Sequence, residues 1–429
     1  MKPTRKGPRI FYGWWVVAAS GFVNLYTGGT FFYGFTAYFN PIIDEFGWSR
    51  SITSLAFSLY RLEGGLAAPI VGFLVDSLGV RKLMMSGAFL FGLGFILLSQ
   101  TNALWSFYGG LLVIALGMST ASILLGFVAV ANWFVRRRSL AMGLLAVGGG
   151  FSGLLVSLVT LSIEQFGWRP TMIMTGIGAW VLALPCAALV RPRPEAYGLR
   201  PDGDPPESDA VAGQSAQTRR DAASPAAMIE FGIGQALRSR TFWVMCVAVS
   251  VAALAENAVV VHQMPLLRSM GISAPLAALV VSGTTLSSII GRVGVAVMGD
   301  RIEKRFSIAL CYVMQACGIL ALLYASDWLL IAVFLLLYGT SAGAIIPLRP
   351  AAQADYFGRE AFATIQGLLT TVRTVGTMIG PVFAGFVFDV SGAYYWAFMV
   401  LALTSLASAP VILAMGSPRA PKAATALSA

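Results

Sequence analysis

The stretch Gly72-Phe-Leu-Val-Asp76-Ser-Leu-Gly79-Val-Arg81-Lys82 is a short charged segment between two long apolar ones. The apolar runs on either side cover roughly 52–75 and 83–100. Each is about as long as the 20 residues that a helix needs to cross a bilayer. The segment therefore predicts a hairpin of two membrane helices. Asp76 ends the first helix, and Arg81 and Lys82 stand at the start of the second.

The same alternation continues along the whole chain of 429 residues, of which 57% are hydrophobic and 11% charged. Mean hydropathy is +0.77, and an ordinary soluble protein has about 25% charged residues. This composition excludes a collagen, a disordered tail and an ordinary soluble enzyme. Helices are the open-chain structure that satisfies its backbone polar groups inside lipid. Twelve spans are predicted, at 13–38, 52–75, 83–100, 104–131, 140–163, 170–190, 242–266, 275–299, 307–325, 328–350, 362–388 and 394–415.

Basic residues are distributed unequally between the two sides of this map. Of 29 Lys and Arg residues, 22 fall in segments that face one side, three face the other, and four lie within spans. Cytoplasmic loops of membrane proteins carry such an excess, so we place both termini in the cytoplasm of a multi-pass protein of the cell (inner or plasma) membrane. The first span is too long for a signal peptide and is expected to be retained. The run Arg136–Arg138 is interpreted as a topology signal, not as a nucleic-acid site.

The two halves of the chain repeat each other at an offset near 224 residues. Asp76 corresponds to Asp300, Pro41 to Pro265 and Gly47 to Gly271 by position. A segment rich in Pro, Ala, Ser, Asp and Arg separates the halves and is predicted to be a disordered or loosely helical linker. We expect a six-helix bundle over 1–190, a cytoplasmic linker over 191–240 and a second bundle over 241–429. Two such parallel repeats are the architecture of a large class of secondary transporters.

The segment 72–82 resembles the signature between helices 2 and 3 of the major facilitator superfamily, and the resemblance covers essentially the whole chain. More narrowly, the chain is similar to the monocarboxylate transporter and oxalate/formate antiporter branch. The resemblance implies an all-α fold of twelve transmembrane helices in two pseudo-symmetric bundles. The segments that carry the narrower resemblance are Tyr12-Gly-Trp-Trp-Val16, Phe46-Gly-Trp-Ser-Arg50, Trp133-Phe134 with Arg138, Ala141 and Gly143, Gly167-Trp-Arg169, and Asp355-Tyr-Phe-Gly-Arg359.

The resemblance also implies a latch at the cytoplasmic side. In this fold Asp76 ends helix 2 beside the N-terminus of helix 11, where the helix dipole favours an anion. Asp300 repeats the arrangement between helices 8 and 5. We expect Asp76 with Arg81, and Asp300 with its neighbouring basic residues, to hold that side shut.

Two arginines lie deep in the predicted helices, where a charge costs about 2.5–3.5 kcal/mol on insertion scales. At about 1.5 Å per residue, Arg292 lies about 12 Å and Arg373 about 18 Å from the inner boundary, near the middle of a core about 30 Å thick. Two guanidiniums at one depth repel each other, but each can bind a carboxylate through two hydrogen bonds. The resemblance implies a basic residue at 292, and a second cation, typically Lys, at 373.

Polar residues of the first helix are further candidates for substrate contact. Asn24 and Tyr33 can each donate a hydrogen bond to a carboxylate. The resemblance gives support to Tyr33 alone.

The remaining membrane charges are interpreted as coupling or gating residues. Arg61 and Glu256 are predicted to form a gate or a charge-compensating pair, and Glu63 or Glu256 is a candidate proton carrier. His262 can titrate near neutrality, although a single histidine at a helix end is commonly structural. Arg349 is expected to act in a cytoplasmic gate or in a local ion pair, with Asp355 six residues away. Ser288 stands where the branch often has an acid, which argues against the animal-type proton mechanism.

We therefore expect a secondary transporter, not an enzyme, that moves a small organic anion, a mono- or dicarboxylate, by alternating access. Protons or a counter-anion would be its coupling partner, the lipid bilayer its surroundings, and a monomer its functional unit. The alternatives are a multidrug exporter and, from another class, a membrane-embedded ligand sensor. No cofactor, metal or nucleic acid is predicted. The four cysteines lack metal spacing, and the glycine pattern at 148–153 follows no strand.

Overall fold

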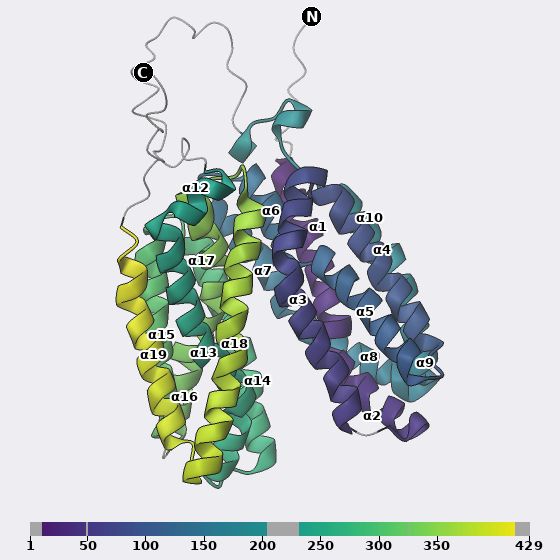
Figure 1. The fold of residues 1–429 in the computed structure, drawn as a ribbon, viewed down its shortest axis with the longest axis vertical. Helices are drawn as coiled ribbons and strands as arrows, with labels where there is room; N and C mark the ends of the chain where they lie inside the picture. Colours follow the sequence, from purple (N-terminus) through teal and green to yellow (C-terminus); the bar gives the residue numbers. More distant parts are fainter. Residues whose placement is uncertain (1–10, 49, 204–230, 326, 417–429) are drawn as a thin grey trace, which may run out of the picture.

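The computed structural model of the chain describes residues 11–48, 50–203, 231–325 and 327–416, without the side chains of 36, 39, 40, 50–62, 274, 275 and 278. Helices form two bundles side by side (Figure 1). The helices of the first bundle are α1 (Tyr12–Thr27), η1 (Gly28–Tyr33), α2 (Phe35–Phe46), α3 (Arg50–Leu78), α4 (Val80–Ser99), α5 (Leu104–Thr120), α6 (Ile123–Trp133), α7 (Arg138–Gly150), α8 (Ser152–Phe166), α9 (Trp168–Gly178), η2 (Ala179–Ala183) and α10 (Leu184–Leu189).

The second bundle follows a short helix, α12 (Ile233–Arg238). Its members are α13 (Arg240–Ser269), α14 (Ala274–Met298), α15 (Lys304–Leu323), α16 (Trp328–Phe334), η7 (Leu335–Gly339), α17 (Thr340–Phe357), α18 (Phe362–Ser391) and α19 (Tyr395–Leu413). Short 3-10 helices, η3 (Glu195–Tyr197) and η4 (Pro201–Gly203), follow the first bundle.

Every one of the twelve predicted spans coincides with a helix or a run of helices. Within the described residues, ten are long and apolar enough to cross a membrane. The other two are the run from α1 to α2 and the helix α3. Three of the runs contain a π-helical segment, at η1, η2 and η7. Such segments widen the helix locally and are frequent at functional sites.

The segment 72–82 folds as the hairpin that its charges predict. α3 ends at Leu78, Gly79 turns the chain, and α4 begins at Val80. Gly79 has a φ of 86°, in the left-handed region where a residue with a Cβ is strained. Glycine at 79 is therefore required by the turn itself.

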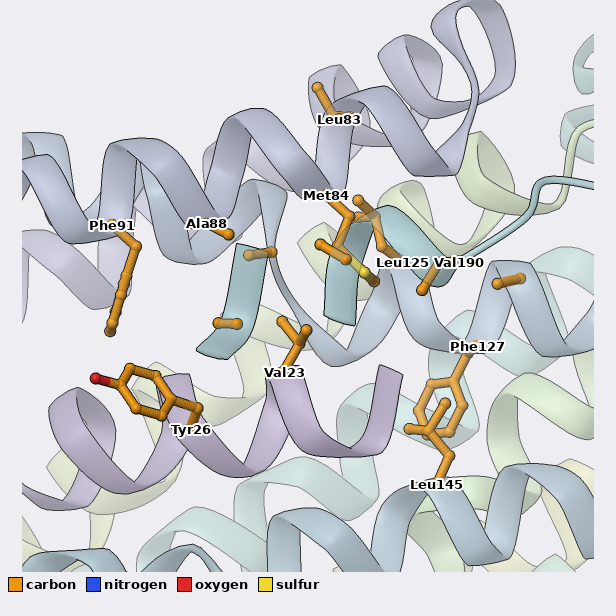
Figure 2. Close-up of a cluster of buried hydrophobic side chains, with 14 of the residues drawn as sticks. Val23, Tyr26, Leu83, Met84, Ala88, Phe91, Leu125, Phe127, Leu145 and Val190 are labelled. Carbon is orange, nitrogen blue, oxygen red and sulfur yellow. The ribbon is translucent and has the colours of Figure 1, made fainter. Parts of the chain in front are cut away.

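Each bundle has its own buried core. In the first bundle, α1 contributes Val23 and Tyr26, which face Met84 and Phe91 of α4 (Figure 2). Tyr26 also donates a hydrogen bond to the carbonyl of Thr175 in α9, at 2.7 Å. These contacts fix α1, and with it η1, against the rest of the first bundle.

The two bundles contact each other at the end where α1 begins and α19 ends, which we call the linker end. They draw apart toward the opposite end (Figure 1). Close approach at the linker end depends on glycine. A Cβ on Gly72 of α3 would lie 2.4 Å from the carbonyl oxygen of Ala363 in α18, and one on Gly143 of α7 would lie 2.8 Å from Ala296 in α14. The bundles are therefore closed together at the linker end.

The predicted linker over 191–240 is ordered at both ends. Arg191 lies over the rings of Tyr12 and Tyr197, 4.0 and 4.2 Å from their centroids. Asp202 accepts hydrogen bonds from the backbone N–H groups of Val135 and Arg136, next to the start of α7. Aromatic and backbone partners of the first bundle therefore bind the first residues of this segment, which contains the short helices η3 and η4. Residues 204–230 lie outside the described part of the chain.

Candidate functional site

A cavity of about 530 Å³ lies between the two bundles. The first bundle lines it with α1, η1, α3 and the helices α5 to α8, and the second with α14, α17 and α18. Its wall is largely apolar and includes Phe32, Ile123, Phe127 and Ile346. Arg292 and Arg373 are the two charged residues among the described ones that line it. The arrangement thus brings the two predicted anion-binding arginines, which are distant in sequence, to one cavity.

Arg292, on α14, is 8% exposed and lacks a carboxylate partner among the described residues. One terminal nitrogen, Nη1, donates to the backbone carbonyl of Ala146 on α7 at 2.9 Å, while the buried Nε has no hydrogen-bond partner. A buried guanidinium with a neutral partner and an unfilled donor retains its full charge for an anion. The residue is therefore poised to bind a negatively charged group.

The glycines of α7 make room for this guanidinium. A Cβ on Gly150 would lie 2.8 Å from Nη1 of Arg292. A Cβ on Gly149 would lie 2.5 Å from the amide nitrogen of Asn24 on α1. The pattern at 148–153 thus serves close packing, as its position in a membrane helix predicts.

Asn24 and Tyr33 both line the same cavity. Tyr33 ends the π-helical segment η1, is 41% exposed, and interacts electrostatically with Arg292. The side chains that the sequence suggests for substrate contact therefore come together.

Arg373, on α18, is bound to Glu256 of α13. Its Nη2 donates to Oε2 of Glu256 at 2.9 Å. Arg349 of α17 forms a second ion pair with Glu256, through Oε1. We call these three residues the arginine–glutamate cluster. Exposure decreases across it, from 34% for the side chain of Arg373 to 12% for Glu256 and 11% for Arg349.

One expectation about these charges differs from the structure and another stays a prediction. The expected pair of Glu256 with Arg61 falls on a side chain outside the described residues; among the described residues, the carboxylate pairs with Arg349 and Arg373. The local ion pair of Arg349 with Asp355 is absent from the described contacts, because Arg349 lies one to two turns deeper in α17 and is drawn to Glu256. Sequence spacing along one helix could not show this partner, which comes from a different helix.

The other two titratable candidates are not among the residues that line the cavity, although Ser119, the partner of Glu63, is. Glu63 of α3 accepts a hydrogen bond from Ser119 of α5 at 2.9 Å, and its second oxygen is buried without a hydrogen bond. Both ring nitrogens of His262 have partners. They are the hydroxyl of Tyr394 at 3.2 Å and the carbonyl of Pro381 at 3.0 Å.

At the linker end both predicted aspartates cap helices of the opposite bundle. Asp76 accepts from the N–H and the hydroxyl of Thr364 in α18, at 2.9 and 2.7 Å. Asp300 accepts from the backbone N–H groups of Ser139 and Leu140 in α7, at 2.7 and 3.0 Å. Arg81 is exposed at the start of α4. Carboxylates at these helix N-termini stabilise the closed linker end.

An ion pair between the two bundles was not predicted from the sequence. Arg138, 4% exposed, donates to Asp355 at 2.8 Å, and Lys304 lies 2.6 Å from the other oxygen of that carboxylate. Because residues 136–138 were interpreted together as a topology signal, Arg138 was not distinguished from its two neighbours. The internal repeat pointed to Asp355 as a residue of interest, because Asp355 stands at the position that Asn132 occupies in the first half.

Comparison with known proteins agrees with the fold and the resemblance. A family model described as the Major Facilitator Superfamily matches residues 17–267 and 257–429. The chain belongs to the Major Facilitator Superfamily. Members of this superfamily are membrane transporters, not enzymes, and the chain is accordingly a multi-pass membrane transporter.

Several curated relatives of this superfamily member are monocarboxylate transporters. Mouse monocarboxylate transporter 12 is 26% identical over 91% of this chain and 82% of its own length. Human monocarboxylate transporter 11 is 28% identical over 98% of this chain and 86% of its own length. The resemblance to the monocarboxylate transporters that the sequence motifs indicate is confirmed.

Solved structures of the superfamily share the fold. The E. coli fucose:proton symporter FucP superposes with a TM-score of 0.65 at 15% identity, covering 95% of this chain and 96% of its own. The proton:xylose symporter XylE gives 0.69 at 12% identity, covering 93% and 94%. The predicted fold of twelve membrane helices in two bundles is confirmed.

Proposed function

We propose that this transporter carries a small organic anion, a mono- or dicarboxylate, by alternating access. One observation carries the proposal: Arg292 is buried beside the interbundle cavity and has no carboxylate partner among the described residues. Burying an unpaired charge in a membrane protein is costly, and such residues mark substrate pathways. The names of the monocarboxylate transporters, its relatives, support the same substrate class.

The cavity supplies a reasonable binding site for such an anion. Arg292 is proposed to hold a carboxylate group, with Asn24 and Tyr33 as polar contacts and Arg373 as a second cation. The apolar wall around Phe32 and Phe127 accommodates the remainder of the molecule. The two cationic side chains disfavour the lipophilic cations that a multidrug exporter would carry.

Alternating access is proposed to use the contacts at the linker end as its inner gate. If the linker end is cytoplasmic, as the basic residues predict, the structure is closed inside and open outside. Inward opening then requires the caps of Asp76 and Asp300 to break, together with the Arg138–Asp355 pair. We propose Arg81 and Arg349 as further gating residues, together with the pair of Arg61 and Glu256 that the sequence suggests.

Coupling is proposed to run either through protons or through exchange for a counter-anion. Glu63 and Glu256 are the candidate proton carriers, as membrane carboxylates beside or near the cavity. His262 is a further coupling candidate, and its two ring nitrogens are held by the hydroxyl of Tyr394 and the carbonyl of Pro381. The carrier is proposed to act as a monomer in the cell membrane.

Uptake into proteoliposomes tests this function. The panel is lactate, pyruvate, oxalate and succinate, with tetraphenylphosphonium as a cationic control, each with and without an inward proton gradient. We expect uptake of at least one acid and none of the cation. Stimulation by the gradient identifies symport, and stimulation by an internal acid identifies exchange. Movement of the cation alone would contradict the proposal and favour the exporter.

A further inference from the structure

The arginine–glutamate cluster connects the cavity to the interior of the second bundle. Glu256 offers one carboxylate oxygen to each arginine: Oε2 to Arg373 at 2.9 Å, and Oε1 to Arg349. Arg373 lines the cavity, whereas Arg349 is buried and is not among the lining residues. Glu256 thus bridges an arginine that a substrate can reach and one that is packed away from the cavity.

This bridge leaves the two arginines of the cavity in different electrostatic states. Arg292 has no carboxylate partner among the described residues, and Arg373 has one. An entering anion therefore finds one arginine whose charge is uncompensated. The charge of the other is already shared with an internal carboxylate.

We propose that Glu256 is a specificity-determining residue that restricts the cavity to anions with a single carboxylate, by holding Arg373. The inference rests on the proposed function, since it concerns which carboxylates the same site accepts. A monocarboxylate places its charged group on Arg292 and its apolar part along the wall of the cavity.

A dicarboxylate meets an obstacle at its second charged group. To reach Arg373 it must displace Oε2 of Glu256, or lie next to it. Displacement breaks a hydrogen bond between charged groups inside the protein, and proximity brings two carboxylates together, which is unfavourable. Arg349 makes displacement harder, because it holds the other oxygen of Glu256 from the buried side.

The surroundings of Glu256 leave it dependent on these two arginines. Among the described residues, the other titratable side chains close to it are Tyr312 of α15 and Tyr338 of η7, both fully buried. The hydroxyl of Tyr338 donates to the backbone carbonyl of Glu256 at 3.1 Å, and so fixes the helix without neutralising the carboxylate. Removing the carboxylate therefore frees Arg373 toward the cavity.

The test compares acids of equal chain length, butyrate and succinate, as competitors of labelled pyruvate uptake in proteoliposomes. The readout is the ratio of the two inhibition constants, which does not depend on how much carrier is inserted. Wild-type carrier is expected to prefer butyrate. In Glu256→Gln the ratio should move toward succinate by about tenfold or more, the usual worth of a hydrogen bond between charged groups.

A charge-matched variant keeps the test sound if Glu256→Gln fails to fold. The double variant Glu256→Gln/Arg349→Gln removes one negative and one positive charge, so the cluster keeps its net charge while Arg373 is released. The same shift toward succinate is expected. A shift in the single variant without one in the double would assign the effect to net charge and overturn the proposal.

Two further outcomes separate this inference from the proposed function. A wild-type carrier that takes up pyruvate but prefers succinate, or variants whose ratio does not move, would overturn the role of Glu256 alone. A wild-type carrier that moves no carboxylate would overturn the proposed function as well.

Discussion

Substituting Gly150 by alanine should displace the guanidinium of Arg292 without removing its charge. The added Cβ would lie 2.8 Å from Nη1 of Arg292 and 3.0 Å from Cγ1 of Ile289. Ordinary contact begins at 3.4 Å, so the guanidinium must retreat by about 0.6 Å. Because Nη1 is the far end of a flexible side chain, the movement is cheap for the protein but costs the bond to Ala146, held at 2.9 Å.

The expected effect is on substrate binding. Misplacing the charge by this distance should cost about 1–2 kcal/mol, which is about a 5- to 30-fold rise in KM for the carboxylate. Thermal stability should change little, since the gain of about 0.5–1 kcal/mol for alanine over glycine in a helix offsets the loss of that bond.

Gly153→Ala is the matched control, because a Cβ there meets no atom within 4 Å. The assay is initial-rate uptake in proteoliposomes, with the melting temperature of each purified variant. An unchanged KM in Gly150→Ala, or an equal change in both variants, would refute the assignment of Arg292 to substrate binding.

Two other changes test the closed linker end. Asp76→Asn keeps an acceptor for Thr364 but loses its charge at the start of α18, worth about 0.3–1 kcal/mol. Labelling of a Ser122→Cys cavity reporter by an impermeant maleimide outside should slow by up to about fivefold, and an unchanged rate would argue against this cap as a gate. Arg138→Ala removes one of the two cations that bind Asp355 and leaves Lys304, so it should cost about 1.5–3 kcal/mol, the worth of a hydrogen bond between charged groups, and should lower the melting temperature by several degrees. The exposed Arg137→Ala should not lower it, and equal effects would show that Arg138 acts only through its charge at the surface.

The sequence predicts much of this molecule because a membrane imposes simple rules. Helices must be long and apolar, so twelve spans can be located from composition alone, and the segment 72–82 identifies one of their turns. Arg292 and Arg373 could be assigned to one depth because a helix rises by a constant amount per residue. Their meeting at one cavity follows from that depth and the packing of the bundles.

Partners on different helices were harder to predict. The depth of Glu256 resembles that of several arginines, and only the packing of α13 against α18 selects Arg373. Arg138 could not be distinguished from Arg136 and Arg137 by composition, although it alone of the three is buried. In both cases the missing information is the rotation of each helix about its axis, which one sequence determines only weakly.

The most direct test of the account is the uptake of a labelled monocarboxylate by wild-type carrier and by Arg292→Ala in parallel proteoliposomes. The control is Arg268→Ala, which changes an exposed arginine that does not line the cavity. The account predicts saturable uptake by the wild type and the control, and its loss in Arg292→Ala at equal protein content. Normal uptake by Arg292→Ala would contradict the assignment of this arginine as the anion-binding residue.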